Sequence, residues 1–507
     1  MAETSPSRYV FGPLERPALL LWLRPGQVGV LASAALLGMM TLRLFDPLSG
    51  AIYGVTLTGV ALAVALVRVW HGKTVEQLAG VAAIYAWRGV RSRHRWLSTK
   101  HVQGQRLVIW SGEQMLEIPQ PQPESLRGLR IISASFHREA QSIGVLKDGR
   151  ARTYVGVLPV RGKDFALTDN SEKAQAVALW ARVIASYALR TLSPVNRIQW
   201  VERTLAEESN AARRQFVERS CKTAPIPALE SYQSVVEQAS PATREHQCFV
   251  VLQVSADRAW RQIRQVAGRD VDQGATAVLL DELKALSRQL MAAQLQVGHP
   301  LTSRAMAELI KSAYDPPSRR RRRDIEAAGG VPGVHPANAW PGATTEHLGA
   351  LHADRAWHAT YHILEWPRTD VDAVFLAPLL LQTDTLRTVA VTMEPVPPPK
   401  ARAQQHRRKS GALTAHAAAD RYGFVMSDQK EHEAETNTRI TAEMKQGHVV
   451  VRFSGYVTVT AFDSAQLERS CADIEIAASL CGLELERLYG QQEIAFTYTL
   501  PICRGLR

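Results

Sequence analysis

The stretch TLRLFDPLSG, Thr41 to Gly50, separates two long apolar segments, and its interpretation decides the fold of the amino-terminal region. Residues 25–42 read PGQVGVLASAALLGMMTL and residues 48–67 read LSGAIYGVTLTGVALAVALV, and neither segment carries a charge. As helices they would be about 27 and 30 Å long, close to the hydrocarbon thickness of a bilayer. They also lack the polar face of a soluble amphipathic helix. The pattern therefore predicts a transmembrane helical hairpin over residues 25–70.

The charges around the hairpin predict its orientation. Basic residues flank both outer ends, whereas the short turn carries one Arg offset by one Asp, so the positive-inside rule places both termini in the cytoplasm. We expect an inner-membrane protein with two spans, and interpret residues 71–100 as a basic juxtamembrane helix on the leaflet or continuing the second span. The alternatives are a cleaved signal peptide and a buried helical hairpin. The residues expected at the membrane surface are Trp22, Arg24, Arg68, Trp70, Lys73, Arg88, Arg91, Arg93 and Arg95.

Length and composition limit the remaining interpretations. With 507 residues, 21% charged and 46% hydrophobic, the chain is typical of a folded protein with two or three units. The net charge of +12 indicates a negatively charged partner but does not distinguish anionic lipid from nucleic acid. The five cysteines are scattered, with no CxxC spacing, which favours unpaired thiols in a reducing compartment over disulfides or a zinc site.

Beyond residue 100 the pattern alternates between strands and helices and predicts the α+β class, with antiparallel sheets. Lys147–Arg150 (KDGR) has the signature of a hairpin turn, and Asp169 with Glu172 forms a capping-box pattern that begins a helix. We divide the chain into a cytoplasmic segment (1–24), the hairpin (25–70), the juxtamembrane helix (71–100) and two cytoplasmic α+β domains (101–240 and 241–507). A long loop (315–350) and a polar helical arm (395–446) interrupt the second domain.

Motifs for catalysis are missing from the sequence. There is no GxxxxGK[ST] phosphate loop, no GxGxxG after a strand, no GxSxG and no HExxH. His358 and His362 have a helical metal-ligand spacing, but WHATYHILEW is typical of a strand, where ordinary polar positions are the simpler interpretation. We therefore predict no cofactor, no metal and no enzymatic activity.

A run of five arginines in the 315–350 loop is the strongest basic feature. It could contact phosphates without reading sequence, although no aromatic residues are interleaved for base stacking. The alternative is a solvated loop that contacts lipid headgroups or an acidic partner. The run consists of Arg319, Arg320, Arg321, Arg322 and Arg323.

Several segments together resemble a family of actinobacterial membrane proteins from conjugation-type (type IV-like) secretion loci. They are KSAYDPP (311–317), EWPRTDVDAVFLAPLLL (365–381), TMEPVPPPKA (392–401) and LYGQQEIAFTYTLP (488–501). The layout resembles a fusion of a small inner-membrane hairpin subunit with the non-catalytic amino-terminal domain of a conjugation ATPase. The positions of the most specific segments are Glu365, Trp366, Pro367, Tyr489, Gly490, Gln491, Gln492, Phe496, Leu500 and Pro501.

The resemblance implies a scaffold or adaptor that docks a separate ATPase, with no catalytic residues to carry over. The expected partners are membrane lipid, the ATPase, other secretion subunits and DNA, within an oligomeric complex. Two alternatives stay open: a membrane-anchored nucleic-acid-binding adaptor and a membrane subunit of type VII secretion.

Overall fold

The fold is described from a computed structural model of the chain. The residues that the structure describes are 25–44, 46–66, 68–70, 73–90, 94–98, 108–111, 114–117, 122–134, 142–162, 169–190, 192–206, 227, 231, 234, 244–267, 270–327, 329–367, 371–381, 384–405, 442 and 449–506.

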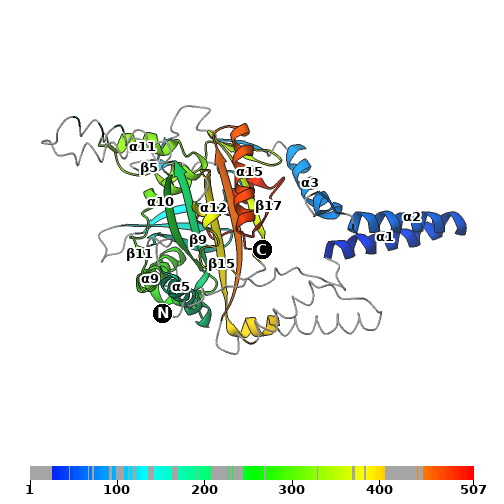
Figure 1. Cartoon of the computed structure of the whole chain (residues 1–507), viewed down its shortest axis with the longest axis horizontal. Helices are drawn as coiled ribbons and strands as arrows, with labels where there is room; N and C mark the ends of the chain where they lie inside the picture. The colour runs from blue at the N-terminus through cyan, green and yellow to red at the C-terminus, as the bar shows by residue number, and fades with distance from the viewer. Residues whose placement is uncertain are drawn as a thin grey trace.

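A single 13-stranded antiparallel sheet forms the body of the molecule (Figure 1). Its order is β3-β12-β13-β14-β16-β15-β9-β10-β8-β7-β6, with β11 paired to β8 and β17 paired to β14. The strands are β3 (Arg95–Leu97), β6 (Leu129–Ala134), β7 (Ile143–Asp148), β8 (Thr153–Arg161), β9 (Val195–Ala206), β10 (Arg244–Ser255), β11 (Gln296–Val297), β12 (Ala343–Glu346), β13 (Leu351–Ala353), β14 (Ala356–Glu365), β15 (Leu386–Val396), β16 (Val450–Ala461) and β17 (Glu484–Arg487).

Strand β9 joins the two halves of the chain. It pairs with β10 on one side and with β15 on the other, so strands from before and after residue 240 share one sheet. Its side chains alternate: Ile198 lies on one face and Val201 on the other, and both are fully buried. This period of two is what a strand covered on both faces requires.

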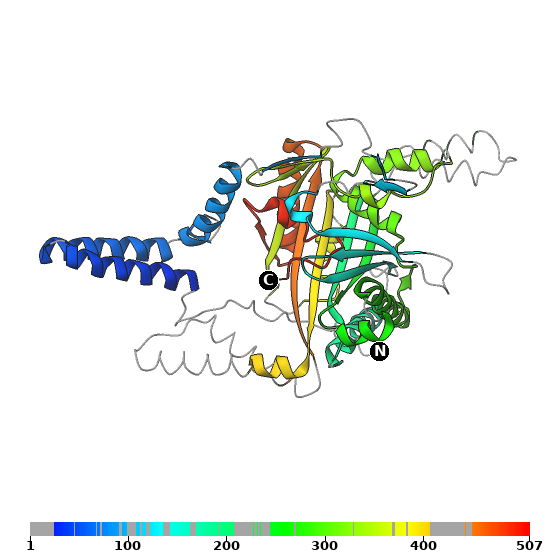
Figure 2. The same cartoon turned by 180° about the vertical axis from the view of Figure 1, so that it is seen from behind.

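Helices cover both faces of the sheet (Figures 1 and 2). Their apolar side chains meet the strand residues of three core clusters, one of which contains Leu283, Leu252 and Ile198. The first face carries α5 (Asn170–Leu189), α8 (Trp260–Ala267), α9 (Val271–Ala292), α12 (Ala377–Leu381) and α15 (Ser464–Leu480), and the second carries α10 (Ser303–Tyr314), η1 (Glu124–Leu126), η3 (Pro336–Asn338) and α16 (Gln492–Phe496).

The carboxyl-terminal residues 498–506, here called the C-terminal strap, cross the second face. The amide of Gln199 on β9 donates to Tyr498 O at 3.0 Å, and its oxygen accepts from Cys503 N at 2.9 Å. Thr392 of β15 donates to Arg504 O at 3.0 Å, and Arg504 forms an ion pair with Asp148 at 2.7 Å. The strap therefore ties together strands that are distant in the sequence.

The amino-terminal helices project from this body as an arm (Figures 1 and 2). Helices α1 (Pro25–Leu44) and α2 (Pro47–Leu66) pack against each other, and α3 (Val75–Val90) connects them to the sheet. Small residues allow the two backbones to approach: a Cβ added at Gly38 would lie 3.6 Å from the Gly54 Cα. Two short hairpins, β1 (Arg68–Trp70) with β2 (Lys73–Thr74) and β4 (Val108–Ser111) with β5 (Gln114–Glu117), stand apart from the large sheet.

The transmembrane part of the predicted fold is wrong. The hairpin is present, but within the described residues no helix combines the length and apolar character needed to cross a membrane. Each helix is 20 residues long, contains many Gly, Ala, Ser and Thr positions, and α1 has Arg43 in its last turn. Such small residues contribute little apolar surface for transfer into lipid. The predicted transmembrane spans, and with them the membrane and two-span inner-membrane localisation, are withdrawn on this finding.

The α+β class with a large antiparallel sheet is confirmed. The KDGR turn lies between β7 and β8 as predicted, and Asp169 is the N-cap of α5, although its side chain makes no capping hydrogen bond. The 315–350 segment contains α11 (Ser318–Ala327), η3 and β12. Most of the predicted 395–446 arm lies outside the described residues; residues 398–405 are helical.

Candidate functional site

A pocket lies on the second face of the sheet, between α10 and the carboxyl-terminal segment. Its volume is about 280 Å³. The floor comes from the ends of β9, β15 and β16, one wall from α10 and the turn that follows it, and the other from α16 and the C-terminal strap. Its lining is mixed: Leu309, Phe496 and Leu500 are apolar, whereas Thr388 and Thr460 carry hydroxyls.

Arg203 on β9 is the buried cation of this pocket, with 3% of its surface exposed. Its Nη1 donates to Leu309 O and to Ser312 Oγ, both at 3.3 Å, and Nη2 donates to Ser312 Oγ at 3.3 Å. Its Nε has no hydrogen-bond partner. Within the described part of the chain, no carboxylate lies within ion-pair distance of this guanidinium. Arg203 is therefore a buried positive charge held only by neutral groups.

Burial lowers the pKa of Arg203 to about 10, and the nearby Arg319 adds to this effect. Because this pKa still lies well above neutrality, the guanidinium stays charged. A buried charge without an ionic partner is costly, since transfer from water removes hydration that neutral hydrogen bonds replace only in part.

Arg319 at the start of α11 lines the pocket opposite Arg203. It makes a two-pronged contact with Glu245 on β10, with Nη1–Oε2 and Nη2–Oε1 distances of 2.9 Å. Arg323 lies 3.7 Å from the same carboxylate. Burial alone would raise the pKa of Glu245, but hydrogen bonds from Arg319 outweigh it and hold this pKa below its usual range.

Arg387 also lines the pocket, but its guanidinium lies on the other face of the sheet. In the β9–β15 register Thr388 lies beside Arg203, and Arg387 lies beside Thr204. The Arg387 guanidinium donates to the carbonyls of Thr385 and Leu380. Its charge is therefore separated from the pocket by the sheet.

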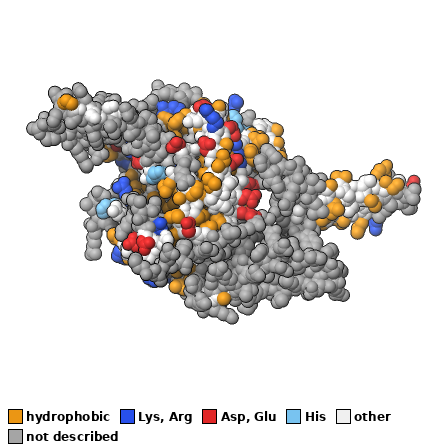
Figure 3. Space-filling model, in the orientation of Figure 1, with side chains coloured by type: hydrophobic (Ala, Val, Ile, Leu, Met, Phe, Trp, Pro, Cys, Tyr) orange, Lys and Arg blue, Asp and Glu red, His pale blue; other side chains and the backbone are white. Residues whose placement is uncertain are grey.

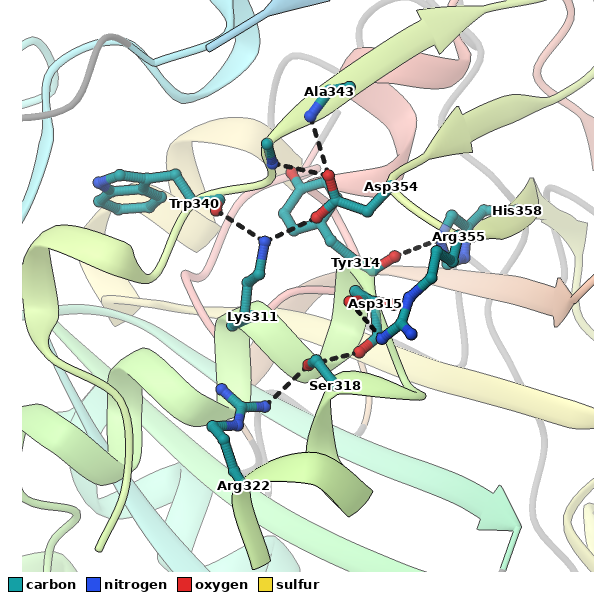
Figure 4. Close-up of polar contacts among 11 residues, drawn as sticks. Lys311, Tyr314, Asp315, Ser318, Arg322, Trp340, Ala343, Asp354, Arg355 and His358 are labelled. Carbon is teal, nitrogen blue, oxygen red and sulfur yellow. Dashed lines mark hydrogen bonds and ion pairs between the residues drawn. The ribbon is translucent and has the colours of Figure 1, made fainter. Parts of the chain in front are cut away.

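A polar network holds α10 and the start of α11 against the β13–β14 turn (Figure 4). Lys311 forms an ion pair with Asp354 at 2.6 Å, and the other oxygen of Asp354 accepts from Gly342 N and Ala343 N. Asp315 accepts from Arg355 through Nε at 3.2 Å and Nη2 at 3.1 Å. These contacts fix the KSAYDPP segment, from which one wall of the pocket is built.

His358 and Tyr314 lie beside this segment, behind the lining of the pocket (Figure 4). The His358 Nε2–H donates to the Tyr314 carbonyl at 3.2 Å, because a carbonyl can only accept, and Nδ1 contacts Thr460 Oγ1 at 3.0 Å. Burial lowers the pKa of His358 to about 4, so the ring is neutral near pH 7. Both rings contact Phe496, with centroid distances of 4.6 and 4.5 Å. His358 is thus a core residue, and no cluster with metal-ligand composition occurs among the described residues.

The arginine run is divided by the structure. Arg319 and Arg323 face Glu245, and Arg322 donates to Ser318 Oγ at 3.0 Å. Arg320 and Arg321 belong to α11, but their side chains lie outside the described set. Three of the five guanidinium groups therefore have partners within the protein, which leaves less positive charge for phosphates than the sequence suggests. Binding of nucleic acid by this run stays a prediction.

The motif positions at the carboxyl end connect the pocket to the arm. Gly490 has φ +67° and seats α3: a Cβ there would lie 3.0 Å from Val81 Cγ1. Gln492 is fully buried and clamps β14, because its Oε1 accepts from Thr360 N at 2.8 Å and its Nε2 donates to Thr360 O at 3.2 Å. Tyr489 lies beside the Arg487 guanidinium, and Gln491 is half-buried. The other members of this segment line the pocket: Phe496, Leu500 and Pro501.

The other motif group lies on the first face, at the end of β14. Trp366 meets Phe453 edge-on at 5.3 Å, and its ring would lie 2.8 Å from a Cβ added at Gly455. Pro367 is buried next to Gly482, and Glu365 pairs with Glu484 in the sheet register. These positions pack the sheet and do not reach the pocket.

The predicted membrane-surface residues are dispersed. Arg88 on α3 forms an ion pair with the buried Glu346 at 3.3 Å, and Arg95 is exposed on β3. Arg68, Trp70 and Lys73 belong to the β1–β2 hairpin, but their side chains lie outside the described set; Trp22, Arg24, Arg91 and Arg93 are outside the described residues altogether.

Sequence reasoning missed Arg203, which lines the pocket, and Glu245 and Asp354, which pair with Arg319 and Lys311 beside it. One signal was present: Glu202 and Arg203 are adjacent charges within the strand sequence RIQWVERTL. A charged pair inside a strand that is buried on both faces requires a special environment. Nothing in one sequence shows that α10 and the strap close over it.

The four described cysteines, Cys248, Cys471, Cys481 and Cys503, are free, which agrees with the predicted unpaired thiols for these positions. Neither a search against protein-family models nor a search of curated proteins finds a match to this chain.

Proposed function

We propose that this chain is a structural adaptor subunit of a multiprotein machine. In this proposal the α1–α2 hairpin is the element that binds another protein, and α3 transmits the contact to the sheet body. The observation that carries the proposal is the amount of apolar side-chain surface that the hairpin leaves uncovered.

The hairpin exposes large apolar side chains from both helices (Figure 3). Val55 is 73% exposed, Leu36 69% and Met39 66%. Several large apolar side chains exposed on one element indicate a site of association, because leaving apolar surface in water is unfavourable by about 25 cal/mol per Å². Covering three such side chains in an interface would stabilise a complex by several kcal/mol, which is about a thousandfold in affinity.

Helix α3 gives the arm a defined attachment. Glu346 of β12, whose side chain is fully buried, contacts Arg88 at 3.3 Å and His94 at 3.5 Å. The same carboxylate accepts from Glu493 N at 3.0 Å, next to the Gly490 seat. A partner bound to the hairpin would therefore be held at a fixed place relative to the sheet, as an adaptor requires.

The identity of the partner rests on the resemblance alone. That resemblance implies a separate ATPase of a conjugation-type secretion machine, and we include docking of this ATPase in the proposal. The experiment is co-purification of the tagged full chain with the ATPase encoded in the same gene neighbourhood.

Two triple variants make this experiment specific. The hairpin variant is Leu36→Gln, Met39→Gln and Val55→Thr. The matched body variant is Leu381→Gln, Leu480→Gln and Ile476→Thr, which changes exposed apolar residues of α12 and α15. We expect the hairpin variant to lose the ATPase and the body variant to retain it. Recovery of the unaltered chain as a lone monomer, or equal retention by both variants, would contradict the proposal.

A further inference from the structure

The pocket beside α10 combines three features that point to a ligand. It encloses about 280 Å³, it has a buried guanidinium at its floor, and most of its remaining lining is apolar or hydroxylic. A cavity of this size fits one small organic molecule. None of these features is used by the proposed docking of the hairpin.

The charge of Arg203 lacks an anionic counterpart. Its three hydrogen bonds go to one backbone carbonyl and one serine hydroxyl, and its Nε remains without a partner. Glu245, Glu308 and Glu202 act on Arg203 from a distance, and none of them forms an ion pair with it in the described part of the chain. Glu245 is occupied by Arg319, and Glu202 contacts His246 at 2.8 Å. A buried arginine of this kind is stable when an anion occupies the adjacent space.

No carboxylate lines the pocket within the described part of the chain. The two cations that face it are Arg203 and Arg319, and the Thr388 hydroxyl of β15 supplies a neutral donor, whereas the Thr460 hydroxyl already donates to His358 Nδ1. The apolar wall formed by Leu309, Phe496 and Leu500 would exclude water from the body of a ligand. Low polarity around a guanidinium strengthens its attraction for an anion.

We propose that this pocket binds a small organic anion, a carboxylate or phosphate group on an apolar body, with Arg203 as the anion-holding residue. The anionic group contacts the guanidinium between β9 and α10. The apolar part lies against Phe496 and Leu500. Arg319 also lines the pocket, but its ion pair with Glu245 offsets its charge, so Arg203 is the cation left for the ligand.

The test is isothermal titration calorimetry of the purified full chain with four probes. Benzoate and phenyl phosphate carry an anionic group on an apolar ring, benzamide is the neutral counterpart of benzoate, and inorganic phosphate has no apolar part. We expect at least one ring-bearing anion to bind at least about tenfold more tightly than benzamide and inorganic phosphate.

Two variants assign the binding to this pocket. Arg203→Gln removes the charge, and Thr388→Leu fills the floor beside it while leaving every charge in place. We expect each to weaken binding of the favoured anion at least about tenfold. The matched control is Arg190→Gln, which removes an exposed arginine that follows α5 and pairs with Glu282. This variant should bind the favoured anion as the unaltered chain does.

If Arg203→Gln does not fold, as judged by circular dichroism, Thr388→Leu carries the test alone. Binding of neither ring-bearing anion overturns the inference. So does equal binding of benzamide and benzoate, or unchanged binding by Thr388→Leu. Tight binding of inorganic phosphate alone would also overturn it, because the apolar wall would then have no role.

Discussion

The sheet body and the helical arm are stabilised in different ways. In the body, strands distant in the sequence are joined by buried polar clamps, such as Gln492 on Thr360 and Gln199 on the C-terminal strap. In the arm, α1 and α2 contact mainly each other and α3, and large apolar residues remain exposed. The difference is that the body buries its apolar residues within the chain, whereas the arm leaves many of them exposed; the proposed function assigns this exposed surface to a partner.

The largest effect is expected where a body clamp is removed. Gln492→Leu keeps the side-chain volume but leaves the buried Thr360 N–H without an acceptor. We expect the free energy of unfolding to fall by about 3 kcal/mol, from the lost hydrogen bonds and the unsatisfied donor. Urea denaturation measures it. Gln265→Leu on the exposed side of α8 is the control and should change stability by less than about 0.5 kcal/mol. Equal effects of the two variants would contradict the clamp.

A pH effect of similar size should arise at His358. Its folded-state pKa is about 4, whereas an unfolded histidine has a pKa of about 6.5, so between these values the unfolded chain binds more protons. The free energy of unfolding should therefore fall by about 3 kcal/mol as pH drops from about 6.5 to 4. His358→Gln should remove this part of the pH dependence in thermal unfolding, and exposed His299→Gln should keep it. A slope unchanged by His358→Gln would contradict the assignment.

A Gly→Ala substitution should destabilise the body more than the arm. At Gly144 in the body, an added Cβ would lie 2.6 Å from the Ser303 backbone nitrogen, so Gly144→Ala should cost about 1–3 kcal/mol by overpacking. At Gly54 in the arm, the closest atoms are 3.5 Å away, which is ordinary contact. Gly54→Ala should change stability by less than about 1 kcal/mol. Thermal unfolding compares them, and equal destabilisation would show that the arm is packed as tightly as the body.

The smallest effect is expected at the junction of arm and body. Glu346→Gln keeps the acceptor for Glu493 N but removes the charge that pairs with Arg88 and His94. We expect global stability to change by less than about 1 kcal/mol, while backbone amides of residues 75–90 exchange faster with deuterium. Hydrogen-exchange mass spectrometry measures both regions in one sample. Unchanged exchange in α3 would show that Glu346 does not anchor the arm.

Local features of the body could be predicted from the sequence. The segment WHATYHILEW indicated strand β14, and Asp148-Gly149 indicated the turn between β7 and β8. These signals depend on residues close in the chain, so one sequence carries them. The order of the strands depends on pairing between residues such as Arg203 and Thr388, nearly two hundred positions apart, and leaves no local pattern.

For the arm, the local structure was predictable from the sequence but its environment was not. The sequence predicts its two helices and their turn, but an absence of charge alone does not make the described helices long and apolar enough to cross a membrane. The pocket could not be predicted from the sequence for another reason. Arg203, Arg319 and Phe496 meet only after the sheet, α10 and the strap have assembled. Motif residues at the carboxyl end were noticed through resemblance, but their roles as clamp, seat and wall come from the structure.

The proposed docking role of the hairpin is tested most directly by measuring partner affinity and body stability on the same two triple variants. We expect that Leu36→Gln, Met39→Gln and Val55→Thr together weaken binding of the ATPase at least about tenfold while the unfolding temperature of the body stays unchanged. The body variant at Leu381, Leu480 and Ile476 should bind as the unaltered chain does. Preserved affinity in the hairpin variant, or a loss that is accompanied by unfolding of the sheet, would contradict the central claim.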